Sequence, residues 1–127
     1  MMAALALSLA FIHVSASAAN LSDQDRKFLS VYEKVHAALT IDDLDGAKAA
    51  VPELGKAGAD LAKSSSLKDA RAAFEKLSDQ AIKASKGQPG YYVVHCPMLK
   101  KDWLQTSKTV SNPYGGKGML TCGEIKG

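Results

Sequence analysis

Residues 91–103 of this 127-residue chain are YYVVHCPMLKKDW, and the chain closes with GMLTCGEIKG over residues 118–127. The opening YYVVH is rich in aromatic and β-branched residues, which predicts a short extended segment. Five side chains with soft or borderline-soft donor atoms for a metal ion occur in this part of the chain: His95, Cys96, Met98, Met119 and Cys122. The two cysteines are the only ones in the sequence. We therefore expect the chemistry of the protein to lie in its last third.

The chain that precedes this region has helical periodicity. Apolar residues recur at spacings of three and four in three stretches: Phe28, Val31, Tyr32, Val35 and Leu39; Leu44, Ala47, Val51, Leu54, Gly58 and Leu61; Leu67, Ala70, Phe74, Leu77, Ala81 and Ala84. Ser22 and Ser66, each with an aspartate three residues later, are capping signals for the first and third helices. Pro52 predicts a kink in the second helix.

These stripes predict an all-α fold, because no single amphipathic helix can bury its apolar face alone. We expect an antiparallel bundle of three main helices, with the C-terminal motif region, residues 90–125, packed across it as loops and a short strand or helical turn. His36, next to Val35 and with no second donor three or four residues away, is expected at the helix surface or boundary. The helices are expected to serve as scaffold.

The first 19 residues contain no charged side chain and end in the small residues SASAA. A stretch this short is typical of a secretory signal peptide and not of a membrane span. We expect residues 1–19 to be removed and residues 20–127 to form one soluble domain that is periplasmic or secreted. The main alternative is an uncleaved N-terminal anchor.

The charge pattern excludes several classes of protein. The 16 basic and 13 acidic residues are interspersed and leave a net charge of +3, without the concentrated basic face of a nucleic-acid-binding protein. No later apolar run is long enough to span a bilayer. Redox, haem-attachment, nucleophile-elbow and phosphate-loop motifs are all missing from the sequence, so we do not expect an enzyme.

The five donor residues form a pattern that suits copper(I) and, less selectively, zinc. Successive side chains of an extended segment point in opposite directions, so Cys96 and Met98 can face one metal ion while His95 cannot easily join them. Met119 and Cys122 share a face if their segment turns like a helix. We therefore predict a metal site formed by Cys96, Cys122, Met98 and Met119, with His95 as the least certain ligand.

A disulfide is the open alternative, because exported proteins with two cysteines usually join them. A Cys96–Cys122 bridge would close a loop of roughly 25 residues and stabilise the fold by about 3 kcal/mol. Trp103 also has two interpretations: it could anchor a core, or it could stack on a bound cation.

The C-terminal motifs resemble those of one family. Four motifs carry the resemblance: Cys96-Pro97-Met98, Trp103-Leu104, Asn112-Pro113-Tyr114 followed by Gly115 or Gly116, and Met119-Leu120 followed by Cys122-Gly123. In the helical part, Ala38-Leu39 with Asp42-Asp43 also matches. The family is a small uncharacterised domain that occurs alone in exported bacterial proteins, or fused to the C-terminus of CusB-like periplasmic adaptors of heavy-metal efflux pumps. The resemblance spans residues 28–125.

The resemblance implies a link to copper and silver efflux through the fusion partner. It favours a soluble periplasmic metal-binding module for copper(I), with silver(I) or zinc as other possible metals. Lacking the adaptor's β-barrel and hairpin regions, the chain is expected to be a free-standing module that binds metal and hands it to an efflux adaptor or another envelope protein. The alternative is a disulfide-stapled interaction domain that docks on such a partner through its helices.

Overall fold

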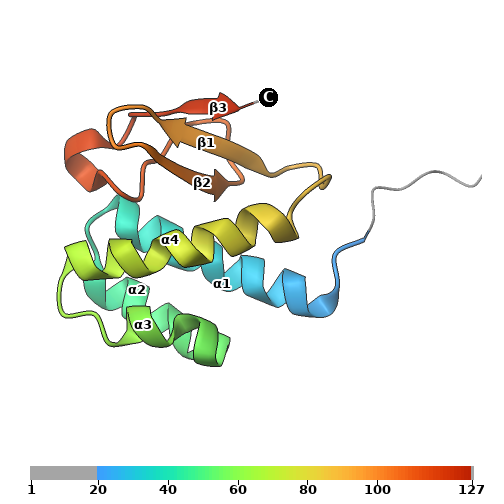
Figure 1. Cartoon of the computed structure of the whole chain (residues 1–127), viewed down its shortest axis with the longest axis horizontal. Coiled ribbons are helices and arrows are strands. Elements are labelled where there is room, and N and C mark those ends of the chain that lie inside the picture. Colours follow the sequence, from blue (N-terminus) through green and yellow to red (C-terminus); the bar gives the residue numbers. More distant parts are fainter. Residues whose placement is uncertain (1–19, 127) are drawn as a thin grey trace, which may run out of the picture.

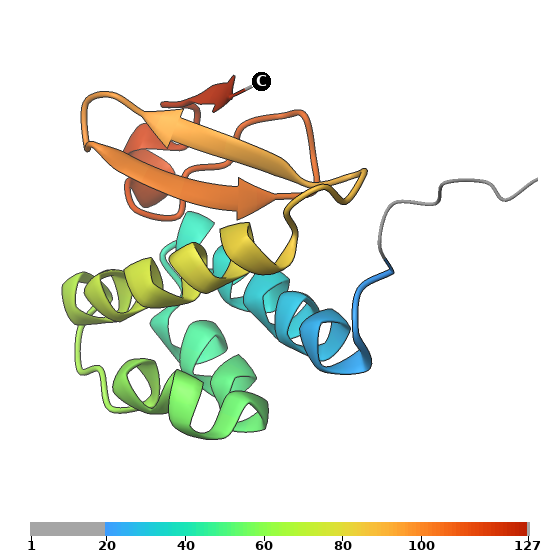
Figure 2. The ribbon, with the colours of Figure 1, turned by 45° about the vertical axis from the view of Figure 1, so that its right-hand side comes forward.

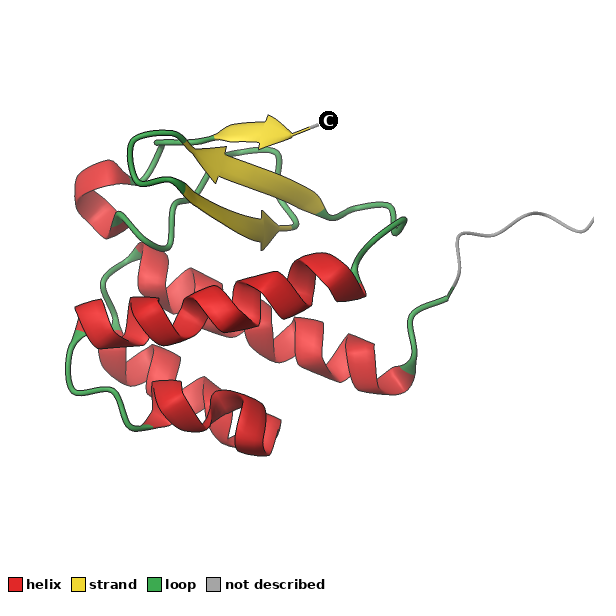
Figure 3. Cartoon of the chain, in the orientation of Figure 1, coloured by secondary structure: helices red, strands yellow, loops and turns green. Residues whose placement is uncertain are grey.

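The structure, a computed structural model, describes residues 20–126, and the predicted signal peptide, residues 1–19, lies outside this range. Helices form one side of the molecule and a small sheet forms the other (Figures 1 and 3). The elements in chain order are α1 (Asp23–Thr40), α2 (Leu44–Ala50), the 3₁₀ helix η1 (Val51–Gly58), α3 (Ala59–Ala62), α4 (Leu67–Ala84), β1 (Tyr92–Cys96), β2 (Lys101–Gln105), the 3₁₀ helix η2 (Gly116–Met119) and β3 (Glu124–Lys126).

The prediction of an all-α fold is wrong. The last third of the chain forms a three-stranded antiparallel sheet in the order β2-β1-β3, so the architecture is a mixed one of helices and sheet. The extended segment predicted from YYVVH is present as β1. A lone strand would leave its backbone N–H and C=O groups unpaired, so β1 needs neighbouring strands. Here β2 pairs with one side of β1 and β3 pairs with the other.

The two long helices form as the sequence predicts. The side chain of Ser22 accepts a hydrogen bond from the backbone N–H of Asp25 at the start of α1, and Ser66 does the same for Asp69 at α4. Most of their apolar stripe residues are buried and pack together in a helical core. No helix within residues 20–126 is both long enough and apolar enough to cross a membrane.

The second predicted helix is broken into three pieces, α2, η1 and α3. Its kink near Pro52 is confirmed, because the α-helix ends at Ala50 and a 3₁₀ segment begins. Gly55 then adopts φ 54° and ψ −124°, a conformation that only glycine reaches at little cost. This stretch is therefore a chain of short turns that covers α1 and α4 (Figure 2).

The two faces of the sheet are covered by different parts of the chain. Val93 on β1 and Leu104 on β2, which are cross-strand partners, pack against the helical core. On the opposite face Val94, Cys96 and Trp103 form a second, smaller core, called the sheet core below. Residues 106–123 cover it, so the sheet lies between the helices and an irregular C-terminal layer. Trp103 is fully buried there, as expected of a core anchor.

The edge of β2 is bound by a side chain from α1. The backbone N–H and C=O of Leu104 point away from β1, and both reach the buried hydroxyl of Tyr32. This hydroxyl donates to the carbonyl oxygen at 2.8 Å, accepts from the amide at 2.9 Å and lies 3.2 Å from Ser78 Oγ on α4. Tyr32 thus takes the place of a further strand at this edge, and burial raises its pKa.

Replacing Tyr32 with phenylalanine tests this attachment. The substitution keeps the ring in the core but leaves the amide and carbonyl of Leu104 buried without a partner, which should lower the free energy of unfolding by roughly 1–3 kcal/mol. Urea denaturation followed by tryptophan fluorescence measures the loss. Tyr92→Phe is the matched control, since its half-buried ring lies beneath Lys108 and its hydroxyl is not one of the groups that bind the edge of β2. Equal effects of the two substitutions would contradict the role assigned to Tyr32.

Candidate functional site

The two cysteines meet at one end of the sheet and form a disulfide. Cys96, at the end of β1, is 0% exposed, whereas Cys122, which precedes β3, is half-buried. Their Cα atoms are 5.6 Å apart across a sequence separation of 26 residues. The bridge ties the β1–β2 turn to the segment that follows η2, and these lie at the same end of the sheet (Figure 1). The structure therefore has the Cys96–Cys122 disulfide that the sequence left open as the alternative to a metal site.

The two methionines of the predicted site belong to the turns that the bridge connects. Met98 is 76% exposed in the β1–β2 turn, which closes when the amide of Lys100 donates to the carbonyl oxygen of Cys96 at 2.8 Å. Met119 ends η2 and is half-buried, and its carbonyl oxygen accepts from the amide of Cys122 at 3.1 Å. We call Cys96, Met98, Met119 and Cys122 the four sulfur residues.

His95 lies on the other face of the sheet, with its cross-strand partner Asp102. Its Nδ1 is 2.6 Å from Asp102 Oδ1, and Lys126 Nζ donates to Asp102 Oδ2 at 3.1 Å. Partial burial would raise the pKa of the Asp102 carboxyl, but the hydrogen bonds from His95 and Lys126 outweigh it and hold that pKa below its usual value. The alternation of side chains along β1 therefore separates His95 from the cysteines, as predicted.

A cavity of about 460 Å³ lies beside His95, between the sheet and α4. Glu75 and Asp79 line it from the helix, and Asp102 lines it from the sheet. Within residues 20–126, however, no three histidine, cysteine or carboxylate side chains come close enough together to hold a metal ion. The disulfide and the His95–Asp102 pair are thus two separate clusters on opposite faces.

Asn112 holds the segment that carries Cys122 and Met119. Asn112 is fully buried. Its backbone N–H donates to the carbonyl oxygen of Leu120 at 2.8 Å, and its side-chain Nδ2 donates to the carbonyl oxygen of Cys122 at 2.9 Å. Its Oδ1 accepts from the amides of Tyr114 and Gly115, both at 2.9 Å. Its carbonyl oxygen also accepts from the amide of Gly116 at 3.1 Å. One asparagine therefore closes the loop by five hydrogen bonds, which gives the NPY-G motif a structural role.

Arg71 on α4 connects this loop to the helices. Its Nε donates to the carbonyl oxygen of Pro113 at 2.8 Å, and its Nη2 donates to Leu39 O at 2.9 Å and to Asp42 Oδ1 at 2.6 Å. The hydrogen bond from Arg71 lowers the pKa of the Asp42 carboxyl. Sequence reasoning missed Arg71. Two signals could have drawn attention to Arg71. It is one of only two arginines in the chain, and it directly follows Ala70, a residue of the apolar stripe that is buried in the structure.

His36 has a structural contact of the same kind. Its Nε2 donates to the carbonyl oxygen of Ser111 at 2.8 Å, and its ring stacks on Tyr32 with the two ring planes at 16°. Burial lowers its pKa, so the imidazole is neutral at pH 7. The boundary position expected for His36 is confirmed, and its role is to bind the C-terminal loop.

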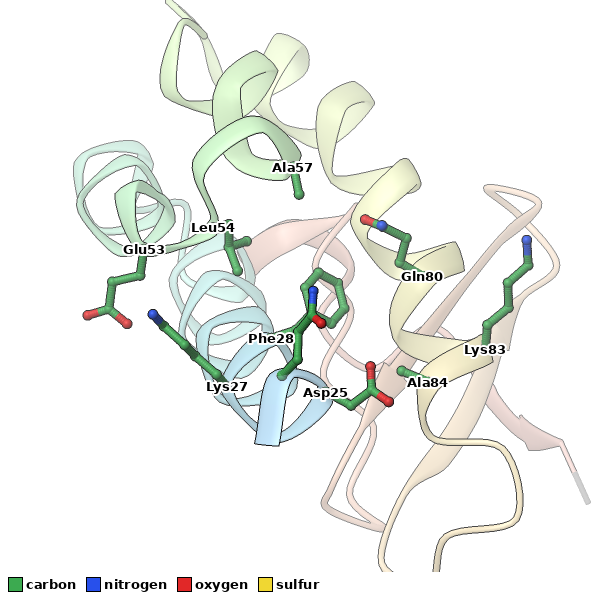
Figure 4. A pocket seen from close by; sticks show the side chains of 10 residues that line it. Asp25, Lys27, Phe28, Glu53, Leu54, Ala57, Gln80, Lys83 and Ala84 are labelled. Atoms are coloured by element: carbon green, nitrogen blue, oxygen red, sulfur yellow. The ribbon is translucent and has the colours of Figure 1, made fainter. Parts of the chain in front are cut away.

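A groove of about 610 Å³ lies on the helical side, lined by residues of α1, η1 and α4 and by none of the four sulfur residues (Figure 4). Phe28 and Leu54 form its apolar floor between α1 and η1, and Ala84 closes it on α4. Charged and amide side chains form the rim, as Figure 4 shows. The groove combines an apolar floor with a polar rim, an arrangement found in many surfaces that bind other proteins.

Together, fold and site define a small helix-and-sheet domain with a disulfide at one end of its sheet and a groove among its helices. Comparison of the chain with known protein families, with curated proteins and with solved structures gives no significant match. The resemblance described above therefore depends on the short motifs alone.

Gly116→Ala should detach the loop from the helices. Gly116 has φ 58°, and a Cβ atom there would collide with the Asp42 carboxylate and with Arg71 Nη2. An alanine held in the left-handed conformation of Gly116 should by itself lower the free energy of unfolding by roughly 1–3 kcal/mol. Displacement of the Arg71–Asp42 ion pair should lower it further. Gly118→Ala in the same short helix is the matched control, because nothing lies within 4 Å of its added Cβ. Urea denaturation compares them, and a Gly118→Ala loss as large as that of Gly116→Ala would contradict the assignment.

Proposed function

We propose that this chain is an exported metal-binding module that holds copper(I) or silver(I) through Cys96, Cys122, Met98 and Met119. The observation that carries the proposal is the convergence of the four sulfur residues on two turns at one end of the sheet. The Cα atoms of the cysteines are 5.6 Å apart, and each methionine shares a short turn with one of them. Thiolates and thioethers are the side chains that copper(I) prefers.

The disulfide is the oxidised, unloaded state in this proposal, because thiolates bind metal and a disulfide does not supply them. Reduction releases two thiols whose backbones stay in place. Asn112 holds the carbonyl oxygen of Cys122, and the pairing of β1 with β2 holds Cys96. The metal ion would then bind between two positioned side chains, so little ordering entropy would oppose binding.

The charges around the two turns suit the same ligands. Two thiolates around one copper(I) ion leave a net charge of −1. Lys100 lies in the turn after Cys96, and Lys117 lies in η2 beside Met119, both exposed. Lys101, the cross-strand partner of Cys96, is already bound to Glu75. The two exposed lysines would therefore offset the charge of the loaded site, and Lys117 also acts on the nearby Asp42 carboxylate.

His95 and zinc fit the proposal less well. His95 Nδ1 is engaged by Asp102, and the ring lies on the face of the sheet opposite Cys96. To join the site it would have to leave that carboxylate and cross to the other face of the sheet. Zinc in structural sites takes four N, S or O ligands in a tetrahedron, and thioethers are poor donors for it. Copper(I) and silver(I) remain the favoured cargo, to be handed to an efflux adaptor or another envelope protein.

The test is copper(I) binding by the reduced protein under anaerobic conditions, in competition with a chromogenic chelator such as bicinchoninate. The wild type should bind one equivalent. Cys96→Ser or Cys122→Ser should weaken binding by roughly 100-fold or more, because each removes a thiolate, whereas Met98→Leu or Met119→Leu should weaken it by about tenfold. The affinity should rise between about pH 6 and pH 8, since thiols with a pKa of about 8.5 must lose their protons.

Thr121→Ala is the matched control for these variants. Thr121 is exposed next to Cys122 and carries no soft donor, so its replacement should leave the affinity unchanged. Circular dichroism of every variant separates loss of ligands from loss of fold. Full copper(I) affinity in both Cys→Ser variants would mean that the metal site is elsewhere.

The second candidate function is a disulfide-stapled interaction domain, favoured by the Cys96–Cys122 bridge itself and by the groove in Figure 4. A thiol count on protein purified from the periplasm without reductant compares the two candidates. Cysteines that stay oxidised in glutathione and never accept copper(I) favour the staple. Thiols that appear in glutathione and become protected by copper(I) favour the metal module.

A further inference from the structure

The two cysteines of the disulfide differ in exposure. Cys96 is 0% exposed and belongs to the sheet core with Val94 and Trp103. Leu99, Val110 and Tyr114 pack against the same core. Cys122 is only half-buried. The two residues before it in the chain, Leu120 and Thr121, are both exposed, with Leu120 at 37%.

We infer that Cys122 Sγ is the site at which an external dithiol forms a mixed disulfide with this protein. Thiol–disulfide exchange requires the attacking thiolate to approach one sulfur in line with the S–S bond, so access decides which sulfur is attacked. The packed residues of the sheet core block such an approach to Cys96. The exposed side of the Leu120–Thr121 turn leaves Cys122 as the open sulfur.

The exchange has two steps. A thiolate of the dithiol attacks Cys122 Sγ, forming a new S–S bond, and the Cys96–Cys122 bond breaks with its electron pair passing to Cys96, which leaves as a thiolate. The second thiol of the dithiol, as its thiolate, then attacks the dithiol sulfur that is bound to Cys122. An S–S bond forms within the dithiol, and Cys122 leaves as a thiolate. The dithiol is oxidised to a disulfide and the protein gains two electrons. Released thiolates take up protons from water according to their pKa values.

Such an attack leaves most of the fold in place. The backbone of Cys122 is held by the Asn112 side chain at its carbonyl and by Met119 at its amide. Cys96 keeps its strand pairing with Lys101. Cys96 Sγ takes up a proton after it leaves, remains in the sheet core beside Cys122, and can close the bridge again as a thiolate. The site therefore favours a dithiol, whose second thiol completes the reduction, over a monothiol.

This inference builds on the proposed function in one respect, namely that reduction at Cys122 would open the copper(I) site. Its test contains no metal, so a failure of copper(I) binding and a failure of this inference are distinguishable. The oxidised protein is treated with excess glutathione for short times, quenched with acid and digested, and the glutathione adducts are located by mass spectrometry. We expect at least roughly tenfold more adduct on Cys122 than on Cys96 in the folded protein.

The same reaction in 6 M guanidinium, where both sulfurs are exposed, is the control and should give comparable adducts on the two cysteines. An equal distribution in the folded protein, or a preference for Cys96, would overturn the inference. If rapid closure of the bridge keeps adducts from accumulating, two single-thiol variants decide the question. The free Cys122 of Cys96→Ser should react with Ellman's reagent at least about tenfold faster than the free Cys96 of Cys122→Ser, and equal rates would overturn the inference.

Discussion

The bonding of the Tyr32 hydroxyl to Leu104 is the contact on which the two halves of this molecule depend. A three-stranded sheet with one very short strand is marginal by itself, and it needs a covering layer and protected edges. Tyr32 supplies both, because its ring lies in the helical core, stacked on Phe74, while its hydroxyl pairs the open edge of β2. Helices and sheet are therefore one cooperative structure, and the site at the far end of the sheet inherits its rigidity from α1 and α4.

A second set of polar contacts fixes the site end. Arg71 joins the carbonyl of Pro113 to the last turn of α1 and to Asp42, while Asn112 closes the loop that ends at Cys122. These contacts do not involve either sulfur. The disulfide is consequently not the only link that positions Met119 and Cys122, so its opening should change the chemistry of these residues more than their placement. A site built this way can alternate between a bridge and a pair of thiols at small structural cost.

The sequence predicted local structure better than it predicted architecture. Helix starts at Ser22 and Ser66 and the break near Pro52 depend on side chains within a few residues, and all three are confirmed. β2 was missed because KDWLQ has little β-branched character and gains its stability from Tyr32, which is 72 residues away in the chain. The sequence did predict that His95 and Cys96 lie on opposite faces of the sheet, because successive side chains of a strand alternate between its faces. The partner of Arg71 could not be predicted, because it depends on how the loop returns to α1.

The burial of Cys96 bears on how one pair of cysteines could serve as both bridge and ligand. A thiolate in an apolar core is costly unless a cation or a hydrogen bond stabilises it. A bound monovalent cation removes this cost, because the ion and the thiolate attract each other strongly where water is excluded. The sheet core thus disfavours the bare thiolate of Cys96, whereas the neutral thiol is readily buried there. Under the proposed function, Cys96 would be joined to Cys122 or bound to a soft metal ion, and a bare thiolate would be its least stable form.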